Sequence, residues 1–325
     1  MLYLQVMKNL YLIDGHALIF RMYYAFLRRP MINSKGEDTS ILFGFTKYLL
    51  ELIAREQPTH LAVMFDPPAK TFRHELYPEY KATRTATPEL VKAALEPLTE
   101  IVRALNIPVL MKPGFEADDV IGTLARRFSS PDCDVYMVTP DKDLGQIVDD
   151  HVFQYKPGKS GGDNEILSKE AICSQYGIDD PLQIIDILAI WGDAADNVKG
   201  VAGVGEVGAR KLVAQYGSLE GIEAHLDELT PRLQAAFREA LPHLPLSKLL
   251  VTVKTDVDIE ADEAQLRLGQ PDENRVAELF KRYEFNSLRS LVPTLSPFPR
   301  KSAERWTAVK RRQTHCCRKP AAAAA

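Results

Sequence analysis

Acidic side chains follow four apolar segments of this chain, each at the point where a predicted strand ends. The segments and their acids are LYLID with Asp14, LAVMFD with Asp66, IPVLMKPGFEADD with Glu116, Asp118 and Asp119, and VYMVTPDKD with Asp141 and Asp143. Ligands of an open α/β sheet bind outside the carboxyl ends of its strands. We therefore expect these carboxylates, which come from separate stretches of sequence, to meet in one crevice.

A fifth acidic element, GDAADN with Asp193 and Asp196, follows later in the chain. Two like charges about 4 Å apart repel each other by roughly 4 kcal/mol at an effective dielectric constant of about 20. Several such pairs stay ionised together only if a cation lies between them, and otherwise some take up protons. Oxygen ligands without His or Cys favour Mg, Mn or Ca. The pattern predicts a divalent-metal site, with one ion or two, of the kind that cuts or transfers phosphate esters.

A segment of interleaved basic and aromatic residues follows Asp66. Its sequence is KTFRHELYPEYKATR, residues 70–84, and it contains Arg73, Tyr80, Lys81 and Arg84. Taken alone, this composition fits a solvated loop equally well. Beside an acidic crevice it favours a phosphate clamp, because cations neutralise a nucleic-acid backbone and aromatic rings stack on unpaired bases.

The run GVGEVG at residues 203–208 matches the GxGxxG pattern of dinucleotide-binding proteins. We reject that interpretation because no strand precedes the run, and the fingerprint requires a strand, a turn and a helix. Gly203, Gly205 and Gly208 instead predict a hairpin between helices whose N–H groups face a phosphate of a duplex backbone. The cations that would assist are Lys199, Arg210 and Lys211. A plain interhelical turn is the alternative.

Apolar strands and helical stretches alternate through the first half of the chain. Strands are expected near residues 9–14, 60–66, 107–111, 134–139 and 151–156, and helices near 40–55, 88–105, 117–128 and 168–176. This alternation predicts an α/β fold with a mostly parallel central sheet flanked by helices. From about residue 177 the strand pattern stops, and the apolar stretch Leu182–Trp191 opens an all-α part.

These patterns divide the chain of 325 residues into three parts. We expect an α/β core over residues 1–176, a helical DNA-binding subdomain over 177–291, and a basic tail over 292–325. The tail has no clear periodicity and ends in alanines, so we expect it to be disordered.

Composition places the chain among soluble globular proteins. It is 46% hydrophobic and 26% charged, and no apolar run reaches the roughly 18 residues of a membrane span. The start lacks a basic region and a cleavage site, so we expect no signal peptide, and Met7 is an alternative first residue. Four scattered cysteines indicate reduced thiols of a cytosolic protein. The net charge of −4 does not exclude a nucleic-acid partner, since much of it comes from the clustered acids.

Six motifs together resemble the 5′ nuclease domain of bacterial DNA polymerase I, within the flap endonuclease superfamily. They are LIDGH, FD followed by FRHE and YK, GFEADDVIGTLA, TPDKDL, GD–DN and GVGEVGARKL. The resemblance runs from about Asn9 to about Leu291. It implies a PIN-like, resolvase-like nuclease core with a helix–hairpin–helix subdomain, and a metal-dependent nuclease that removes 5′ flaps and RNA primers near DNA strand junctions. Residues after about 291 do not resemble the proofreading-like and polymerase domains that normally follow, so polymerase activity is not implied.

The resemblance also implies roles for individual residues. One metal would be held by Asp14, Asp66, Glu116 and Asp118, and a second by Asp119, Asp141, Asp143, Asp193 and Asp196, often through water. Arg73, Lys81 and Arg84 match cations that steer the phosphate at the base of a mobile arch, here about residues 70–88, and Arg21 matches a further substrate contact.

The resemblance implies two Mg²⁺ ions, for which Mn²⁺ can substitute, and a K⁺ ion at the helix–hairpin–helix. The implied protein is a cytoplasmic monomer that works near the nucleoid on DNA with 5′ flaps, nicks or RNA primers, beside a separate polymerase. The implied reaction is hydrolysis with two metal ions that leaves a 5′-phosphate.

Two other functions remain open at this point. A single-strand ribonuclease of the related PIN type is disfavoured by the helical half and the glycine hairpin, because PIN domains are smaller and lack them. A non-catalytic DNA-junction binder is disfavoured by the full acidic set. A Mg²⁺-dependent cleavage assay that compares a flap substrate with single-stranded RNA separates the three functions.

Overall fold

The computed structural model describes residues 7–158 and 163–295. The tail expected to be disordered over residues 292–325 lies outside this part from residue 296 onward, whereas residues 292–295 belong to the helical turn η4 (Asn286–Leu295). The choice between Met1 and Met7 as first residue depends on residues 1–6, which also lie outside this part. No helix within it is both long and apolar enough to cross a bilayer.

A six-stranded sheet forms the centre of the protein, with the strand order β3-β2-β1-β4-β5-β6. The strands are β1 (Lys8–Asp14), β2 (His60–Met64), β3 (Val109–Leu110), β4 (Cys133–Val138), β5 (Val152–Lys156) and β6 (Glu165–Leu167). Every neighbouring pair is parallel except β5 with β6. The chain builds outward from β1 in both directions, so the order reverses between β1 and β4. Such a reversal is where open α/β sheets form their ligand crevice.

The strand β1 shows why helices cover both faces of the sheet. Leu10 and Leu12 belong to one hydrophobic core, whereas Tyr11 and Ile13 belong to another. Each of the four side chains is at most 1% exposed. Because successive side chains point to opposite faces of a strand, a continuous apolar run requires cover on both sides.

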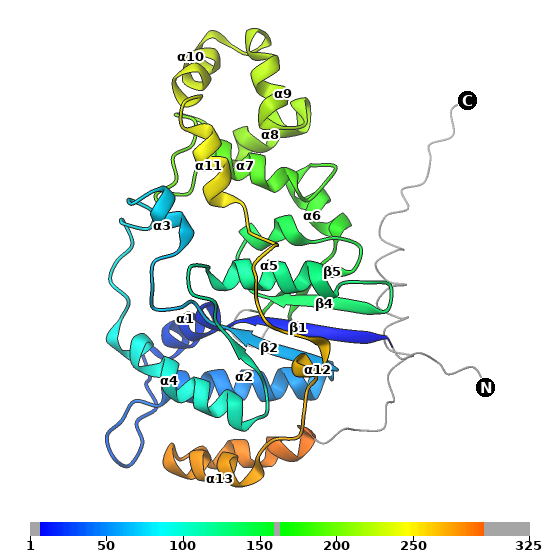
Figure 1. Ribbon diagram of the computed structural model, residues 1–325. Helices are drawn as coiled ribbons and strands as arrows, with labels where there is room; N and C mark the ends of the chain where they lie inside the picture. Colours follow the sequence, from blue (N-terminus) through cyan, green and yellow to red (C-terminus); the bar gives the residue numbers. More distant parts are fainter. Residues whose placement is uncertain (1–6, 159–162, 296–325) are drawn as a thin grey trace, which may run out of the picture.

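Helices supply that cover (Figure 1). On the Tyr11 face lie α1 (Gly15–Phe26), α2 (Ser40–Glu56) and α4 (Glu89–Ala104), and on the Leu10 face lies α5 (Ala117–Phe128). The expected α/β architecture with a mostly parallel sheet is therefore confirmed.

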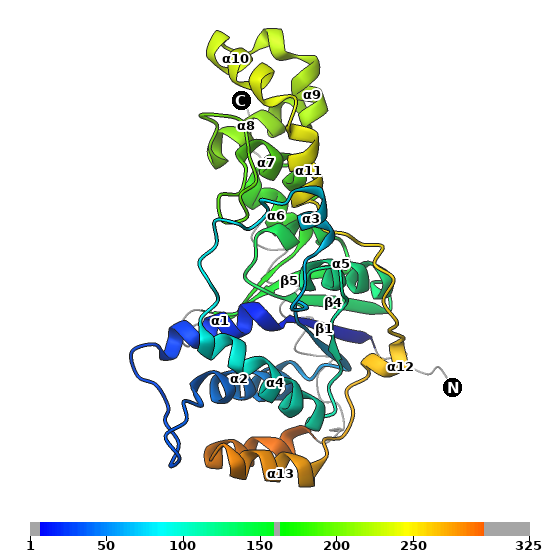
Figure 2. The same ribbon diagram turned by 60° about the vertical axis from the view of Figure 1, so that its left-hand side comes forward.

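A helical part extends from the Leu10 side of the sheet. It comprises α6 (Lys169–Tyr176), α7 (Gln183–Trp191), α8 (Glu206–Tyr216), α9 (Leu219–Ala224), α10 (Pro231–Ala240) and α11 (Leu244–Val251). Both ribbon views place α8, α9 and α10 at the end of the molecule opposite α13 (Glu273–Arg282) (Figures 1 and 2).

The residues after α11 do not stay with this helical part. They run back along the sheet through α12 (Glu263–Leu266) and α13 to η4 (Asn286–Leu295). Leu279 and Phe280 of α13 belong to the same core as Leu98 of α4. The last third of the subdomain expected over residues 177–291 therefore packs on the α/β core. Helical periodicity reveals an apolar face, but not which core receives it.

Some elements were not anticipated from the sequence. Helix α1 contains many aromatic residues, whose intrinsic preference is for strands. Strand β6 has only three residues, and β3 has two where five were expected. The short helix α3 (Phe72–Leu76) lies inside the basic and aromatic segment, and η1 (Asp143–Ile147) follows the TPDK turn. Short elements carry too few residues for a periodic signal.

Candidate active site

Asp14 lies at the end of β1 and at the N-cap of α1. Its Oδ1 accepts a hydrogen bond from the Ala17 N–H at 2.9 Å, and its Oδ2 accepts one from the Thr139 hydroxyl at 3.0 Å. A Cβ on the next residue, Gly15, would lie 2.3 Å from the Phe65 ring, so only glycine fits there. The strand-to-helix turn thus holds this carboxylate in one position.

Asp66 follows β2 and links that strand to α5. Its Oδ1 accepts a hydrogen bond from the Ala117 N–H at 2.7 Å. The His16 Nδ1 accepts one from the Asp66 N–H at 3.0 Å, and burial lowers the pKa of His16. A neutral imidazole that accepts this bond fits both observations. His16 is a contact that the sequence analysis missed, although it belongs to the LIDGH motif.

Burial and neighbouring acids raise the pKa of two carboxyl groups at this place, Asp14 and Asp118. Burial, with added repulsion from Asp66 and Asp141, raises the pKa of Asp14 to about 7. Burial also raises the pKa of Asp118 well above its usual range, and Asp14, Asp141, Asp66 and Glu116 add to the effect. Four segments that are distant in sequence therefore bring acidic side chains to one place.

A lysine stands between two further acids. Lys142 Nζ lies 3.0 Å from Asp143 Oδ1 and 2.8 Å from Asp193 Oδ2, and it lies over the Trp191 ring. Burial acts to raise the pKa of Asp193, but the Lys142 ammonium outweighs this effect and holds that pKa below its usual range. Burial and the nearby Asp141 nevertheless raise the pKa of Asp143 to about 7. The sequence analysis did not identify Lys142 as a site residue. The signal that could have identified it is its place between two candidate metal ligands in Asp141-Lys142-Asp143.

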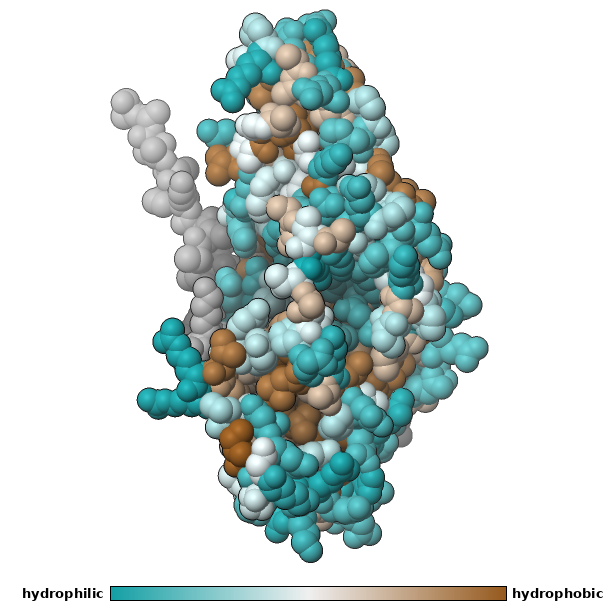
Figure 3. Space-filling model, turned by 90° about the vertical axis from the view of Figure 1, so that its left-hand side faces the viewer, coloured by the Kyte–Doolittle hydropathy of each residue, from teal (hydrophilic) through white to brown (hydrophobic). Residues whose placement is uncertain are grey.

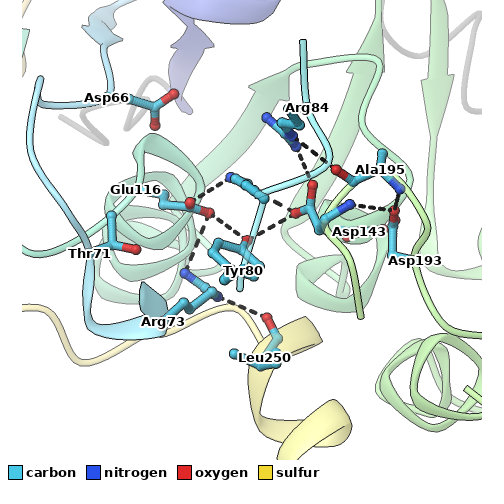
Figure 4. Close-up of polar contacts among 12 residues, drawn as sticks. Asp66, Thr71, Arg73, Tyr80, Arg84, Glu116, Asp143, Asp193, Ala195 and Leu250 are labelled. Carbon is cyan, nitrogen blue, oxygen red and sulfur yellow. Dashed lines mark hydrogen bonds and ion pairs between the residues drawn. The ribbon is translucent and has the colours of Figure 1, made fainter. Parts of the chain in front are cut away.

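The basic and aromatic segment reaches across to the GDAADN loop (Figure 4). Lys81 forms ion pairs with Glu116 and, at 3.9 Å, with Asp196. Arg84 pairs with Asp196, and its side chain is half exposed. The Tyr80 hydroxyl donates to Asp196 Oδ2 at 2.9 Å and to Glu116 Oε2 at 3.2 Å. The cations expected to meet a phosphate thus lie among the acids expected to hold metal.

Arg73 and Asp119 have a different position from the one expected. Both side chains are buried, 3% and 0% exposed, and two parallel hydrogen bonds of 2.7 and 2.8 Å join them. Arg73 also donates to the carbonyls of Leu250 and Thr252, while Asp119 accepts from the Lys254 N–H. Figure 4 shows Arg73 between Glu116 and the α11 end. This pair joins α3, α5 and the residues after α11, and neither side chain is free for a phosphate or a metal.

Three expected DNA-binding side chains are also engaged inside the protein. Tyr80 is 4% exposed, so its ring face is not available for a base to stack on. The Arg21 guanidinium donates to the carbonyls of Pro157 and Gly158. Arg210 pairs with Glu206 and lies over the Tyr176 ring. A sequence shows that these residues carry charge or an aromatic ring, but not which way the side chain turns.

The glycine hairpin lies between two helices, as expected, with α7 before it and α8 after it. Gly203 has a φ of +76°, which L side chains rarely adopt, and Gly205 is the N-cap of α8. Gly208 lies in the first turn of α8. Lys199 and Lys211 are exposed and have no ion-pair partner in the described part of the chain.

The side chains that could hold a metal ion at this site have the chemistry that a hard divalent cation prefers. They are carboxylates, three of which have raised pKa values, and the buried Asp143 Oδ1 accepts no hydrogen bond although Lys142 lies near it. In residues 7–158 and 163–295, however, no three acidic, His or Cys side chains stand close enough to hold a metal ion directly. Lys81 and Lys142 stand among the acids in this conformation.

The face that bears the arch segment is hollowed near its middle, and hydrophilic residues surround the hollow (Figure 3).

Comparisons with known proteins agree with this arrangement. Residues 9–177 match the family described as 5′-3′ exonuclease, N-terminal resolvase-like domain, and residues 179–274 match 5′-3′ exonuclease, C-terminal SAM fold. A 5′-3′ exonuclease of Aquifex aeolicus is 38% identical over 282 residues, which cover 87% of this chain and 94% of that protein. DNA polymerase I of Chloroflexus aurantiacus is 37% identical over 301 residues, 89% of this chain but 32% of the relative. This chain thus spans about a third of the polymerase relative.

Solved structures share the fold. The T5 D15 protein, co-crystallised with metal ions, has a TM-score of 0.61 at 18% identity and covers 89% of this chain and 100% of its own. Flap endonuclease-1 from Methanococcus jannaschii has a TM-score of 0.61 at 17% identity, covering 90% and 92%. Two family domains in the expected order and a relative matched over nearly its whole length lead to one conclusion: this chain is a nuclease that belongs to the 5′-3′ exonuclease family.

Proposed function

We propose that this chain is a metal-dependent 5′-3′ exonuclease and 5′-flap endonuclease that cuts DNA, and RNA primers, at strand junctions and leaves a 5′-phosphate. The observation that carries the proposal is the meeting of carboxylates from the ends of β1, β2 and β4 and the start of α5, where burial and the neighbouring acids raise the pKa of Asp14 and of Asp118. The name of the Aquifex relative and the DNA substrate in a solved structure of the catalytic core of Rad2 support it.

The proposed ligands follow the resemblance with one change. We assign Asp14, Asp66, Glu116 and Asp118 to a first Mg²⁺ ion, and Asp141, Asp143, Asp193 and Asp196 to a second. Asp119 is left out because its oxygens already accept hydrogen bonds from Arg73 and from two backbone N–H groups. Divalent cations bound there supply Lewis acidity toward a phosphodiester. Mn²⁺ is expected to substitute, and the K⁺ ion at the hairpin remains part of the proposal.

The side chains of the arch segment then act on the substrate. With divalent cations held by these acids, Lys81 and Arg84 would be attracted less strongly to Glu116 and Asp196. A phosphate would then be their better partner. Tyr80 stays in place and orients Glu116 and Asp196 through its hydroxyl. Arg73, whose Nη1 lies 3.5 Å from Glu116 Oε2, holds that carboxylate from the buried side.

The test is a duplex with a labelled 5′ flap, incubated with the protein in Mg²⁺ or in a chelator. We expect Mg²⁺-dependent cutting next to the junction, a 5′-phosphate on the downstream product, and weaker cutting of plain single-stranded RNA. Cutting of single-stranded RNA alone would support the PIN-type ribonuclease instead. Binding of the junction with no cutting in Mg²⁺ or Mn²⁺ would support a non-catalytic binder.

We further propose that the chain acts as a monomer, close to the nucleoid, on junctions that a separate polymerase also uses. Sedimentation of the protein with and without flap DNA tests the first of these points. A mass of two chains in the free protein would contradict it.

A further inference from the structure

The first turn of α10 lies against the glycine hairpin. The guanidinium of Arg232, the second residue of α10, reaches to 3.5 Å from the place where a Cβ on Gly203 would stand. Leu233, its neighbour, lines a groove of about 520 Å³ together with residues 203–208, Lys211 and Leu212. The hairpin and the start of α8 therefore form one wall of this groove, and the start of α10 forms the other.

The groove has an apolar floor and cationic edges. Val204, Val207, Leu212 and Leu233 contribute the apolar part, and Val207 is 66% exposed. Lys211 stands on the α8 side and Arg232 on the α10 side, and both are exposed. No acid except Glu206 lines the groove, and that carboxylate already pairs with Arg210.

The two arginines of α10 differ in their partners. Arg238 pairs with Asp227 at 3.3 Å, and both side chains are exposed. Arg232 has no hydrogen-bond or ion-pair partner among the residues that the structure describes. An unpaired guanidinium that leans over a backbone turn is free to donate two parallel hydrogen bonds to a phosphate.

We propose that Arg232 binds a backbone phosphate of duplex DNA across the groove from Lys211. The apolar floor then faces the deoxyribose carbons between phosphates, and the two cations contact the chain of phosphates from opposite edges. This inference rests on the proposed function for the identity of its ligand, but it concerns duplex binding and not cleavage. A contact of this type is independent of sequence.

The experiment measures binding of the full chain to a labelled blunt duplex, by fluorescence anisotropy, in a chelator and over a series of KCl concentrations. We expect Arg232→Ala to weaken binding roughly fivefold at low salt and to lower the slope of log K against log salt by about 1. Lys211→Ala should do the same, and Arg232→Lys should keep most of the slope. Arg238→Ala is the matched control on the same helix and should leave the slope unchanged.

An unchanged slope for Arg232→Ala overturns the inference, and so does an equal loss in Arg238→Ala, because that result would reflect only the net charge of α10. Unfolding curves for each variant exclude misfolding as the cause. If the flap assay shows no cutting while the Arg232 slope falls as expected, the proposed function fails and this inference stands. If cutting is normal and the slope for Arg232→Ala is unchanged, the proposed function stands and this inference fails.

Discussion

Two arginines of residues 70–84 have opposite environments. Arg73 is buried and its guanidinium makes four hydrogen bonds, whereas the Arg84 side chain is half exposed and pairs with Asp196. Removing one partner of a buried ion pair costs about 3–5 kcal/mol, because the other charge stays buried and unpaired.

We expect Arg73→Met to lower the unfolding free energy by about that amount, as measured by urea denaturation. Arg84→Met should leave the unfolding free energy nearly unchanged and slow single-turnover cutting. The opposite pattern would return Arg73 to the role of a phosphate-steering residue.

Asp118 and Asp119 are neighbours with different tasks. The Asp118 side chain has no hydrogen-bond partner among the described residues, and burial and four nearby acids raise its pKa, whereas both carboxylate oxygens of Asp119 accept hydrogen bonds. We expect Asp118→Asn to abolish flap cutting while duplex binding and stability are kept, because it removes one charge from the proposed metal site. The exposed Asp258→Asn is the matched control. Cutting by Asp118→Asn at more than about a tenth of the normal rate would contradict the assigned ligand set.

At the scale of elements, the residues after α11 carry the connection between the helical part and the α/β core. Gln146 of η1 is 1% exposed; its amide donates to the Val251 carbonyl at 3.0 Å and accepts from the Val253 N–H at 2.9 Å. Gln146→Ala leaves two buried backbone groups unpaired, so we expect a loss of about 2–4 kcal/mol of unfolding free energy. Hydrogen exchange at Val253 should become faster as well. The exposed Gln175→Ala is the control, and equal protection of Val253 in the wild type and Gln146→Ala would contradict the role of Gln146.

At the scale of the whole molecule, stability should depend on pH and on divalent cations together. The pKa of Asp14 and that of Asp143 rise to about 7 from the model-peptide value of 3.8. Between about pH 4 and pH 7 the folded chain therefore binds more protons than the unfolded chain, and the unfolding free energy falls as the pH rises. Divalent cations that bind these carboxylates only in the folded chain stabilise the folded state with the carboxylates ionised. We expect the Tm in a chelator to fall from pH 5 to pH 7, and saturating Mg²⁺ to remove most of that fall. Parallel Tm curves with and without Mg²⁺ would mean that these acids bind no cation.

Much of this protein could be predicted from local features of the chain. The strand ends at Asp14, Asp66 and Asp141 were visible because a strand end and a carboxylate next to it both lie within a few residues of sequence. The parallel sheet and the hairpin before α8 followed from the same kind of signal. A family resemblance carried by six short motifs gave the activity, since those motifs contain the acids themselves.

Tertiary structure alone decided which of these side chains face the crevice. Asp118 and Asp119 are adjacent, but successive residues of a helix point in directions about 100° apart, so one faces the other acids and the other meets Arg73. Packing also decides whether a cation is buried or exposed. Arg73 is buried because residues more than a hundred positions later in the sequence pack on it, whereas Arg232 is exposed beside the hairpin at Gly203. Residue type determines what a group can do chemically, whereas packing determines what it can reach.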